Sequence, residues 1–387
     1  MSGAVSVDRF VRCDPLEVAV GWIYGLEPAT DLPRETPAPR AALAAALRPA
    51  LQAGPCYVTF SGGRDSSAVL AAATALARAE GLEPPVPVTR VYPDIPATDE
   101  SNWQRRVIDH LGLKDWIRLE YRDGETDLLG EAAQEGVRAD GLLWPPAVHT
   151  HRAMFSRLGG GSLLTGEGGD AVIGPRRGTA LAALRRGRLN PATLRAAVGA
   201  ALPRPLLERR LVRRAMDTPH SRWLRPAAMA RHARRLAADE AQEPLRFDAG
   251  TWFLTRPRAF HALVHNHAAV ASGFGLRVVE PLLDPGFIAA LARWGGAWGP
   301  GGRTAMMTAL FSDLLPAAVL ERTSKAAFNL VYTGPATREF AQSWDGTGVD
   351  HDLVDAEQLR AVWLSETPTM SAGVLLHGAW LAAQGAE

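Results

Sequence analysis

The sequence predicts an α/β fold, in which a parallel sheet carries helices on both faces and a mostly helical C-terminal half follows. Up to about residue 166, short apolar runs alternate with helical patterns, as is typical of a parallel sheet. From about Leu181 onward, helical patterns dominate and the alternation stops. Two glycine-rich turns each follow an apolar run, so we expect both at the carboxyl ends of strands, where such sheets bind ligands.

The order of the alternating elements follows from hydrophobic periodicity and from the positions of glycine and proline. An irregular, proline-containing lead-in over residues 1–38 comes first. We expect strands at residues 56–60, 86–92, 116–121 and 162–166. Around them we expect helices at residues 40–54, 66–80, 98–113, 124–137 and 147–158.

The composition indicates a globular protein without membrane segments. The 387 residues are 47% hydrophobic and carry a net charge of +1. Because no long apolar span and no signal-peptide pattern occur in the sequence, we expect no membrane partner and a cytoplasmic location. Cys13 and Cys56 lack metal-ligand spacing, which argues against a zinc site or a disulfide framework. We assign residues 1–50 to an N-terminal lead-in and residues 51–385 to one domain.

The stretch "YVTFSGGRDSSAVLAAA", from Tyr57 to Ala73, places glycines and hydroxyls between an apolar strand and an alanine-rich helix. Backbone N–H groups, hydroxyl donors and the positive end of the helix together favour a polyanion. Asp65 would repel phosphate unless a cation lies between them, so the loop implies Mg²⁺. The alternative is a tight turn with ordinary helix capping. The predicted phosphate-binding residues are Ser61, Gly62, Gly63, Asp65, Ser66 and Ser67.

The second glycine-rich turn, "LLTGEGGDAVIG", follows the fourth predicted strand. Gly166 and its neighbours allow a tight turn, with Glu167 and Asp170 directed into the same crevice as Asp65. Two aspartates from separate strand ends can share Mg²⁺ on a nucleotide. The alternative is a glycine-rich turn whose acids are solvated. We predict Asp65 and Asp170 as metal ligands and Gly166 as part of the nucleotide site.

These two motifs resemble those of known families. "SGGRDSS" resembles the SGGxDS loop of the PP-loop ATP pyrophosphatases, which cleave ATP between the α and β phosphates. "GEGGDA" resembles the corresponding turn of asparagine synthetases and β-lactam synthetases. The resemblance implies a sheet of the PP-loop type, a synthetase domain over residues 51–385, ATP and Mg²⁺ as cofactors, and Asp65 and Asp170 as Mg²⁺ ligands. It places Glu167 where a catalytic Glu or Tyr stands in these families.

Two further stretches bear on catalysis. "LPAAVLERTSKAAF" resembles a C-terminal motif of the same families, which implies that Lys325 is the catalytic lysine; a lysine beside the α-phosphate would offset charge in the transition state. The predicted helix over residues 257–275 carries His261, His265 and His267. We predict His265 as a general base, and a partly buried structural histidine is the alternative.

Looser stretches over residues 20–385, including "WIYGLEPA" and "LLHGAWLA", resemble the lasso peptide cyclases. This resemblance implies adenylation of a side-chain carboxylate of a precursor peptide and macrolactam closure by the peptide's N-terminal amine. It adds a leader peptidase and a leader-recognition protein as expected partners. Because barely sixty residues precede the loop, we expect no complete glutaminase domain and an amine that comes with the substrate. The alternatives are a ligase acting on a small carboxylic acid with ammonia or an internal amine, and a degenerate ATP-binding scaffold.

An arginine-rich segment spans residues 176–235. It contains sixteen arginines and only two acidic residues, Glu208 and Asp217. The pattern "LLERRLVRRAM" alternates arginine pairs with apolar residues at helical spacing, which favours packed amphipathic helices. A docking surface for the peptide or for its protease partner is the second interpretation. Because no aromatic stacking pattern accompanies the arginines, we expect no nucleic-acid partner.

Overall fold

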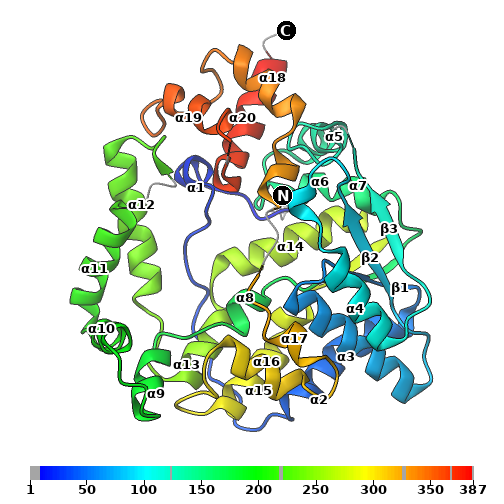
Figure 1. The fold of residues 1–387 in the computed structure, drawn as a ribbon. Coiled ribbons are helices and arrows are strands. Elements are labelled where there is room, and N and C mark those ends of the chain that lie inside the picture. The colour runs from blue at the N-terminus through cyan, green and yellow to red at the C-terminus, as the bar shows by residue number, and fades with distance from the viewer. Residues whose placement is uncertain (1–8, 123, 218–220, 325–327, 367, 386–387) are drawn as a thin grey trace, which may run out of the picture.

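The computed structural model describes residues 9–122, 124–217, 221–324, 328–366 and 368–385 (Figure 1). Five parallel strands form one sheet in the order β3-β2-β1-β4-β5. The predicted α/β class and the four predicted strands are confirmed, with β1 at the centre. The bounds of the strands are β1 Cys56–Thr59, β2 Val86–Val91, β3 Ile117–Glu120, β4 Gly161–Leu164 and β5 Leu276–Val279.

The fifth strand, β5, lies in the half of the chain in which we expected strand alternation to have stopped. It pairs in parallel with β4, from Leu276 opposite Gly161 to Val279 opposite Leu164. A four-residue strand owes its conformation mainly to its neighbours in the sheet, so the local sequence does not mark it. Because β5 pairs with β4, β4 is an inner strand. The second glycine-rich turn therefore follows an inner strand of the sheet and not an edge strand.

One face of the sheet is covered by the helix that follows the first glycine loop and by helices from the C-terminal half. Val58 of β1 and Leu164 of β4 are buried there against Leu70 and Phe287. Figure 1 shows these helices gathered below the sheet. Their bounds are α2 Pro39–Ala53, α3 Arg64–Glu80, α4 Ser101–Leu111, α13 Phe247–Trp252, α15 Pro285–Gly295, α16 Arg303–Phe311 and α17 Ala317–Leu320.

The other face of the sheet is covered by α14, Arg258–Ser272, and by two short helices. Val88 of β2 and Leu163 of β4 pack there with Phe155 and Val270. The single helix predicted over residues 147–158 is in fact the pair α6 Ala147–Thr150 and α7 Arg152–Phe155. The predicted helices on both faces of the sheet are therefore confirmed.

A second hydrophobic core joins the N-terminal lead-in to the C-terminal helices, at the top of Figure 1. Leu16 and Val20 of the lead-in are buried in it with Trp344 and Trp380. The lead-in is also held by the buried carboxylate of Glu17, which accepts hydrogen bonds from Arg258 and from the Tyr24 N–H. The helices of this core are α1 Pro15–Val20, α5 Glu131–Asp140, α12 Pro226–Glu240, α18 Pro335–Ser343, α19 Ala356–Trp363 and α20 Gly373–Gln384.

The arginine-rich segment forms helices, as the amphipathic pattern predicts. Several of its arginines join neighbouring parts of the fold: Arg177 donates to the carbonyls of Ala200 and Leu202, and Arg235 pairs with Asp14 at 2.7 Å. A structural role therefore accounts for these side chains, and docking to a partner stays a prediction. The remaining helices of the segment are α9 Thr179–Arg185, α10 Pro191–Ala200 and α11 Arg204–Met216.

Short 3₁₀ helices connect several of the longer elements. They lie at Pro96–Thr98, Phe253–Thr255, Pro281–Leu283, Asn329–Tyr332 and Met370–Ala372. Among the helices that the structure describes, none has the length and apolar character needed to cross a bilayer.

Candidate active site

The first glycine loop connects β1 to α3 and leaves the start of the helix open to a ligand. Gly62 has a φ of 80°, and a Cβ there would lie 3.0 Å from the Gln104 side chain, so only glycine fits the turn. Gly63 caps α3 without a side-chain hydrogen bond. The first N–H groups of this helix therefore keep donors for an anion, as expected of a phosphate-binding loop.

The hydroxyls of this loop fall into two groups. Ser61 Oγ and Ser66 Oγ lie 3.1 Å apart, and the Gly63 N–H donates to Ser61 Oγ. All three residues line a cavity of about 530 Å³ at the ends of the strands. Ser67 does not line that cavity. Its side chain is fully buried, and its hydroxyl has no hydrogen-bond partner among the described residues. Direct phosphate binding by Ser67 therefore has no geometric support.

The second glycine-rich turn packs directly on the first loop. A Cβ at Gly169 would lie 2.4 Å from Asp65 Cγ, and one at Gly166 would lie 2.8 Å from Ser66 N. No larger residue fits at either position unless the two turns separate. The turn continues into the short helix α8, Gly169–Val172, which carries Asp170 in its first turn. The structure thus brings together the residues of both motifs, as we predicted.

Arg303, the first residue of α16, joins the two predicted metal ligands. Its Nη2 lies 2.6 Å from Asp65 and its Nη1 lies 3.0 Å from Asp170. Arg303 also donates to the Gly169 carbonyl at 3.1 Å. Burial raises the pKa of Asp65, and the nearby charge of Arg303 opposes that rise. Two carboxylates that contact one cation in this way lie close enough together to bind a divalent ion that also binds a polyphosphate.

Asp65 and Asp170 are the predicted metal ligands of this site. Within the described part of the chain, no three His, Cys, Asp or Glu side chains gather to hold an ion. Asp65 and Asp170 can therefore supply two ligands to a Mg²⁺ ion, with waters and phosphate oxygens completing its coordination. This arrangement is typical of a nucleotide site rather than of a structural metal site.

A cavity of about 530 Å³ opens at the carboxyl ends of the strands, beside both turns. Its volume lies within the range of small-molecule sites. Phe260 and Leu263 of α14 form part of an apolar side. The opposite charges balance among the described lining residues, which include the arginines Arg64, Arg90, Arg303 and Arg322 and the acids Asp65, Glu100, Glu167 and Asp170.

Arg322 contacts the backbone of the first glycine loop. It is buried, donates to the Gly62 carbonyl at 2.9 Å and pairs with Glu100. Its guanidinium also lies 4.7 Å from the centre of the Trp103 ring. Sequence reasoning singled out neither Arg303 nor Arg322, although Arg322 stands three residues before Lys325 in a quoted motif. Lys325 itself lies outside the described residues.

A family comparison bears directly on this site. The sequence model of the asparagine synthase family, described as "Asparagine synthase", matches residues 39–372. The chain belongs to the asparagine synthase family. No individual curated protein matches the sequence significantly. Membership supports ATP-dependent amide-bond formation in general, ATP as a substrate, and the PP-loop type of sheet.

His265, predicted as the general base, lies away from the cavity of this asparagine synthase fold. Its Nε2 is 2.8 Å from the Arg9 carbonyl oxygen, and it is not among the described lining residues. Successive helical residues turn by about 100°, so residue 265 points about 160° away from Leu263, which lines the cavity. His267 lies only about 40° from Leu263 by the same arithmetic. The cavity-lining side of α14 is therefore not the side that carries His265, and neither His265 nor His267 is among the described lining residues.

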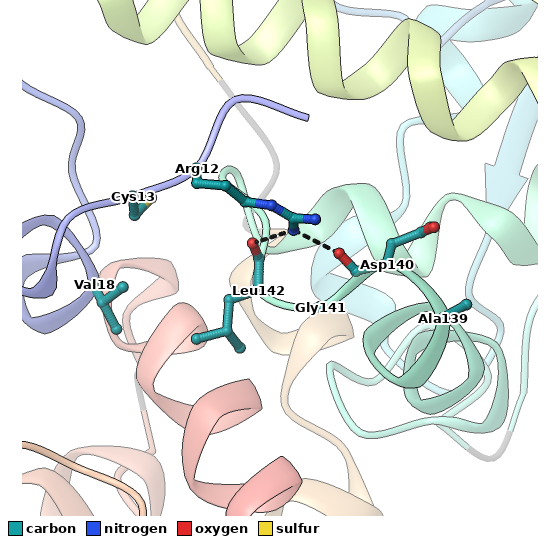
Figure 2. A pocket seen from close by; sticks show the side chains of 7 residues that line it. All are labelled: Arg12, Cys13, Val18, Ala139, Asp140, Gly141 and Leu142. Atoms are coloured by element: carbon teal, nitrogen blue, oxygen red, sulfur yellow. Dashed lines mark hydrogen bonds between the residues drawn. The ribbon is translucent and has the colours of Figure 1, made fainter. Parts of the chain in front are cut away.

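A second pocket, of about 420 Å³, lies between the lead-in and the end of α5 (Figure 2). Arg12 crosses it and donates to the carbonyls of Asp140 and Leu142. Cys13 lines this pocket, and burial raises the pKa of its thiol to about 12. A thiol with such a pKa is not a nucleophile at neutral pH. Cys13 is therefore not an activated thiol in this asparagine synthase-family protein, and the contacts of Arg12 tie the lead-in to the end of α5.

Proposed function

We propose that this asparagine synthase-family protein activates a side-chain carboxylate of a precursor peptide with ATP and closes a macrolactam with the peptide's N-terminal amine. The observation that carries the activation step is the pair Asp65 and Asp170, held by Arg303 where the two glycine-rich turns meet. The cyclisation step rests on the resemblance to lasso peptide cyclases. The ATP-dependent part agrees with family membership.

The first half-reaction would use the loop residues. A carboxylate oxygen attacks the α-phosphorus of ATP, the bond to the β-phosphate oxygen breaks, and pyrophosphate leaves with that electron pair. Ser61, Gly63 and Ser66 would hold the departing pyrophosphate through N–H and hydroxyl donors. Asp65 and Asp170 would hold Mg²⁺, which supplies charge neutralisation to the phosphates when it is bound.

The second half-reaction would use the wider cavity. The amine nitrogen attacks the acyl carbon, AMP leaves, and one proton is lost from nitrogen. Phe260 and Leu263 provide an apolar wall that would exclude water from the acyl adenylate, which protects it from hydrolysis. Lys325 would offset the negative charge on the intermediate. Glu167, a residue of the second glycine-rich turn, lines the cavity. Precursor peptide, leader peptidase and leader-recognition protein are the partners that this proposal requires.

Intact-mass analysis tests the proposal. The chain is co-expressed with the short open reading frames that flank its gene and with their leader protease, and is then assayed with and without ATP and Mg²⁺. We expect an ATP-dependent loss of one water from a cleaved peptide, and no such loss with Asp65→Asn. Pyrophosphate release with a small carboxylic acid, without any change in peptide mass, would overturn the peptide assignment and favour the small-molecule ligase.

A further inference from the structure

Three titratable side chains form a hydrogen-bonded row on the α14 face of the sheet. Glu280 directly follows β5, His267 lies on α14, and His151 lies between α6 and α7. Glu280 Oε1 is 2.8 Å from His267 Nδ1, and His267 Nε2 is 3.2 Å from His151 Nδ1. Glu280 and His267 are 6% and 5% exposed, so two of the three groups have little contact with solvent.

One placement of protons satisfies both hydrogen bonds of this row. In it, His267 donates its Nδ1–H to a carboxylate oxygen of Glu280, and its Nε2 accepts the Nδ1–H of His151. Burial is the main cause that holds the pKa of His151 well below its usual value. His151 is therefore neutral, and its Nε2 keeps a lone pair that can accept a proton.

The row ends beside residues of the cavity wall, and His151 itself is not among the described lining residues. Met154 follows His151 by one helical turn and lines the cavity. Arg90 of β2 also lines it and is close enough to His151 for their charges to interact. Leu263, one turn before His267, is a third lining residue. The nucleotide loop leads into α3 on the opposite face of the sheet, so the two groups approach the strand ends from different sides.

We propose that His151 is the general base that takes a proton from the attacking amine, with His267 and Glu280 as positioning residues. This inference rests on the proposed function and adds that the substrate presents its amine from the α14 side. As nitrogen bonds to the acyl carbon, an N–H proton passes to His151 Nε2, and AMP leaves with the electron pair of the C–O bond. The Glu280 carboxylate stabilises the charge that forms on the two imidazoles.

The purely structural reading is that the two imidazoles only fill space, since His151 and His267 also contact the Phe155 ring. Measuring the two half-reactions separately distinguishes the structural interpretation from the catalytic one. With the peptide identified by intact mass, His151→Ala should release pyrophosphate and yield hydroxylamine-trapped acyl groups at nearly the wild-type rate. Ring closure should fall about 10²-fold, the usual contribution of a general base. Added imidazole should restore part of it.

A matched control is His261→Ala. His261 is on α14, but its ring is exposed and lies against the Thr255 carbonyl, so both half-reactions should stay unchanged. His151→Gln provides a second variant in case His151→Ala does not fold. An equal loss in pyrophosphate release and ring closure, without imidazole rescue, would overturn the base role of His151.

A second measurement needs no substrate. Long-range ¹H–¹⁵N spectra of histidine-labelled protein at pH 7, assigned with His151→Gln and His267→Gln, report which ring nitrogen carries the proton. We expect the Nδ1–H tautomer at both His151 and His267. A charged or Nε2–H His151 would overturn the base role and leave the peptide proposal standing. Expected tautomers together with no peptide product would instead overturn the peptide proposal.

Discussion

The Nη2 atom of Arg303 lies 2.6 Å from both carboxylate oxygens of Asp65. The two residues are far apart in the chain, one at the start of α3 and the other at the start of α16. The contact couples the nucleotide loop to the C-terminal helices. A Mg²⁺–nucleotide complex that engages Asp65 must therefore share this carboxylate with, or take it from, the guanidinium of Arg303.

Arg303→Met should lower the free energy of unfolding of the nucleotide-free protein by about 1–3 kcal/mol, because it leaves a mostly buried carboxylate without its charged partner. Mg²⁺ alone should then raise the Tm of the variant more than that of the wild type, since the ion binds the folded state. Thermal unfolding with and without Mg²⁺ measures both effects.

Arg122→Met is the matched control. Arg122 also contacts two acids, Asp94 and Glu120, but all three side chains are more than half exposed. Such pairs contribute little to stability, so Mg²⁺ should shift the Tm of this variant and of the wild type equally. Equal Mg²⁺ responses in Arg303→Met and Arg122→Met would contradict a shared charge site at Asp65.

Asp65→Asn should reduce ATP-dependent pyrophosphate release by about 10²-fold or more, because it removes the negative charge that would hold Mg²⁺ on the phosphates. The far-UV circular dichroism should not change. Asp94→Asn, which alters an exposed carboxylate outside the cavity, should release pyrophosphate normally. Full activity in Asp65→Asn would show that the loop does not hold the nucleotide as we infer.

Stability should fall with acid because of His377. Burial lowers the pKa of this histidine to about 4, and its Nε2 lies 2.8 Å from the Leu128 carbonyl. A depressed folded-state pKa means that the unfolded chain binds the proton more tightly. The stabilisation from neutral His377 is therefore present above about pH 6.5 and lost as the pH falls toward 4. Between pH 7 and pH 5 we expect a loss of about 2 kcal/mol from this group.

Urea unfolding at the two pH values measures this loss. His377→Gln keeps a donor for Leu128 but cannot titrate, so its stability should depend less on pH. His261→Gln, at an exposed position, should keep the wild-type dependence. If His377→Gln and the wild type lose the same free energy between pH 7 and pH 5, another group is responsible.

Glu17→Gln should destabilise the protein by about 2–3 kcal/mol. Glu17 is 0% exposed and pairs with Arg258, whose side chain is 30% exposed, so part of the penalty of breaking a buried ion pair is relieved by solvent. Chemical unfolding measures the change. Glu27→Gln, an exposed position of the same lead-in, should have almost no effect. Similar behaviour of both variants would mean that Glu17 does not anchor the lead-in.

The parts of the site that the sequence predicted are those encoded locally. Ser61, Gly63 and Asp65 stand in one short loop after a strand, and Asp170 stands in another, so residue type and position were enough to bring them together. Arg303 reaches the same point from a helix that begins in "GGRTAMM", and nothing in that stretch indicates a charge partner. Only the fold brings the helix to the loop.

The histidines illustrate the same limit. The sequence placed three of them on one helix but did not indicate which face turns to the cavity, because polar residues occur on both sides of α14: Asn266 and His267 are buried, whereas His261 and His265 are exposed. His151, from a different helix pair, has no local signal at all. The role that we propose for it rests on the contact with His267 and, beyond it, Glu280. The strand that positions Glu280 was missed for the same reason.

The pairing of β5 with β4 also has a consequence for the protein's synthesis. While the ribosome makes the chain from Leu164 to Leu276, on the order of 10 s at typical rates, β4 presents an open edge to its surroundings. Open edges of this kind recruit strands from other chains. Expression at lower temperature or with more chaperone should therefore raise the soluble yield, and a fragment that ends before β5 should aggregate.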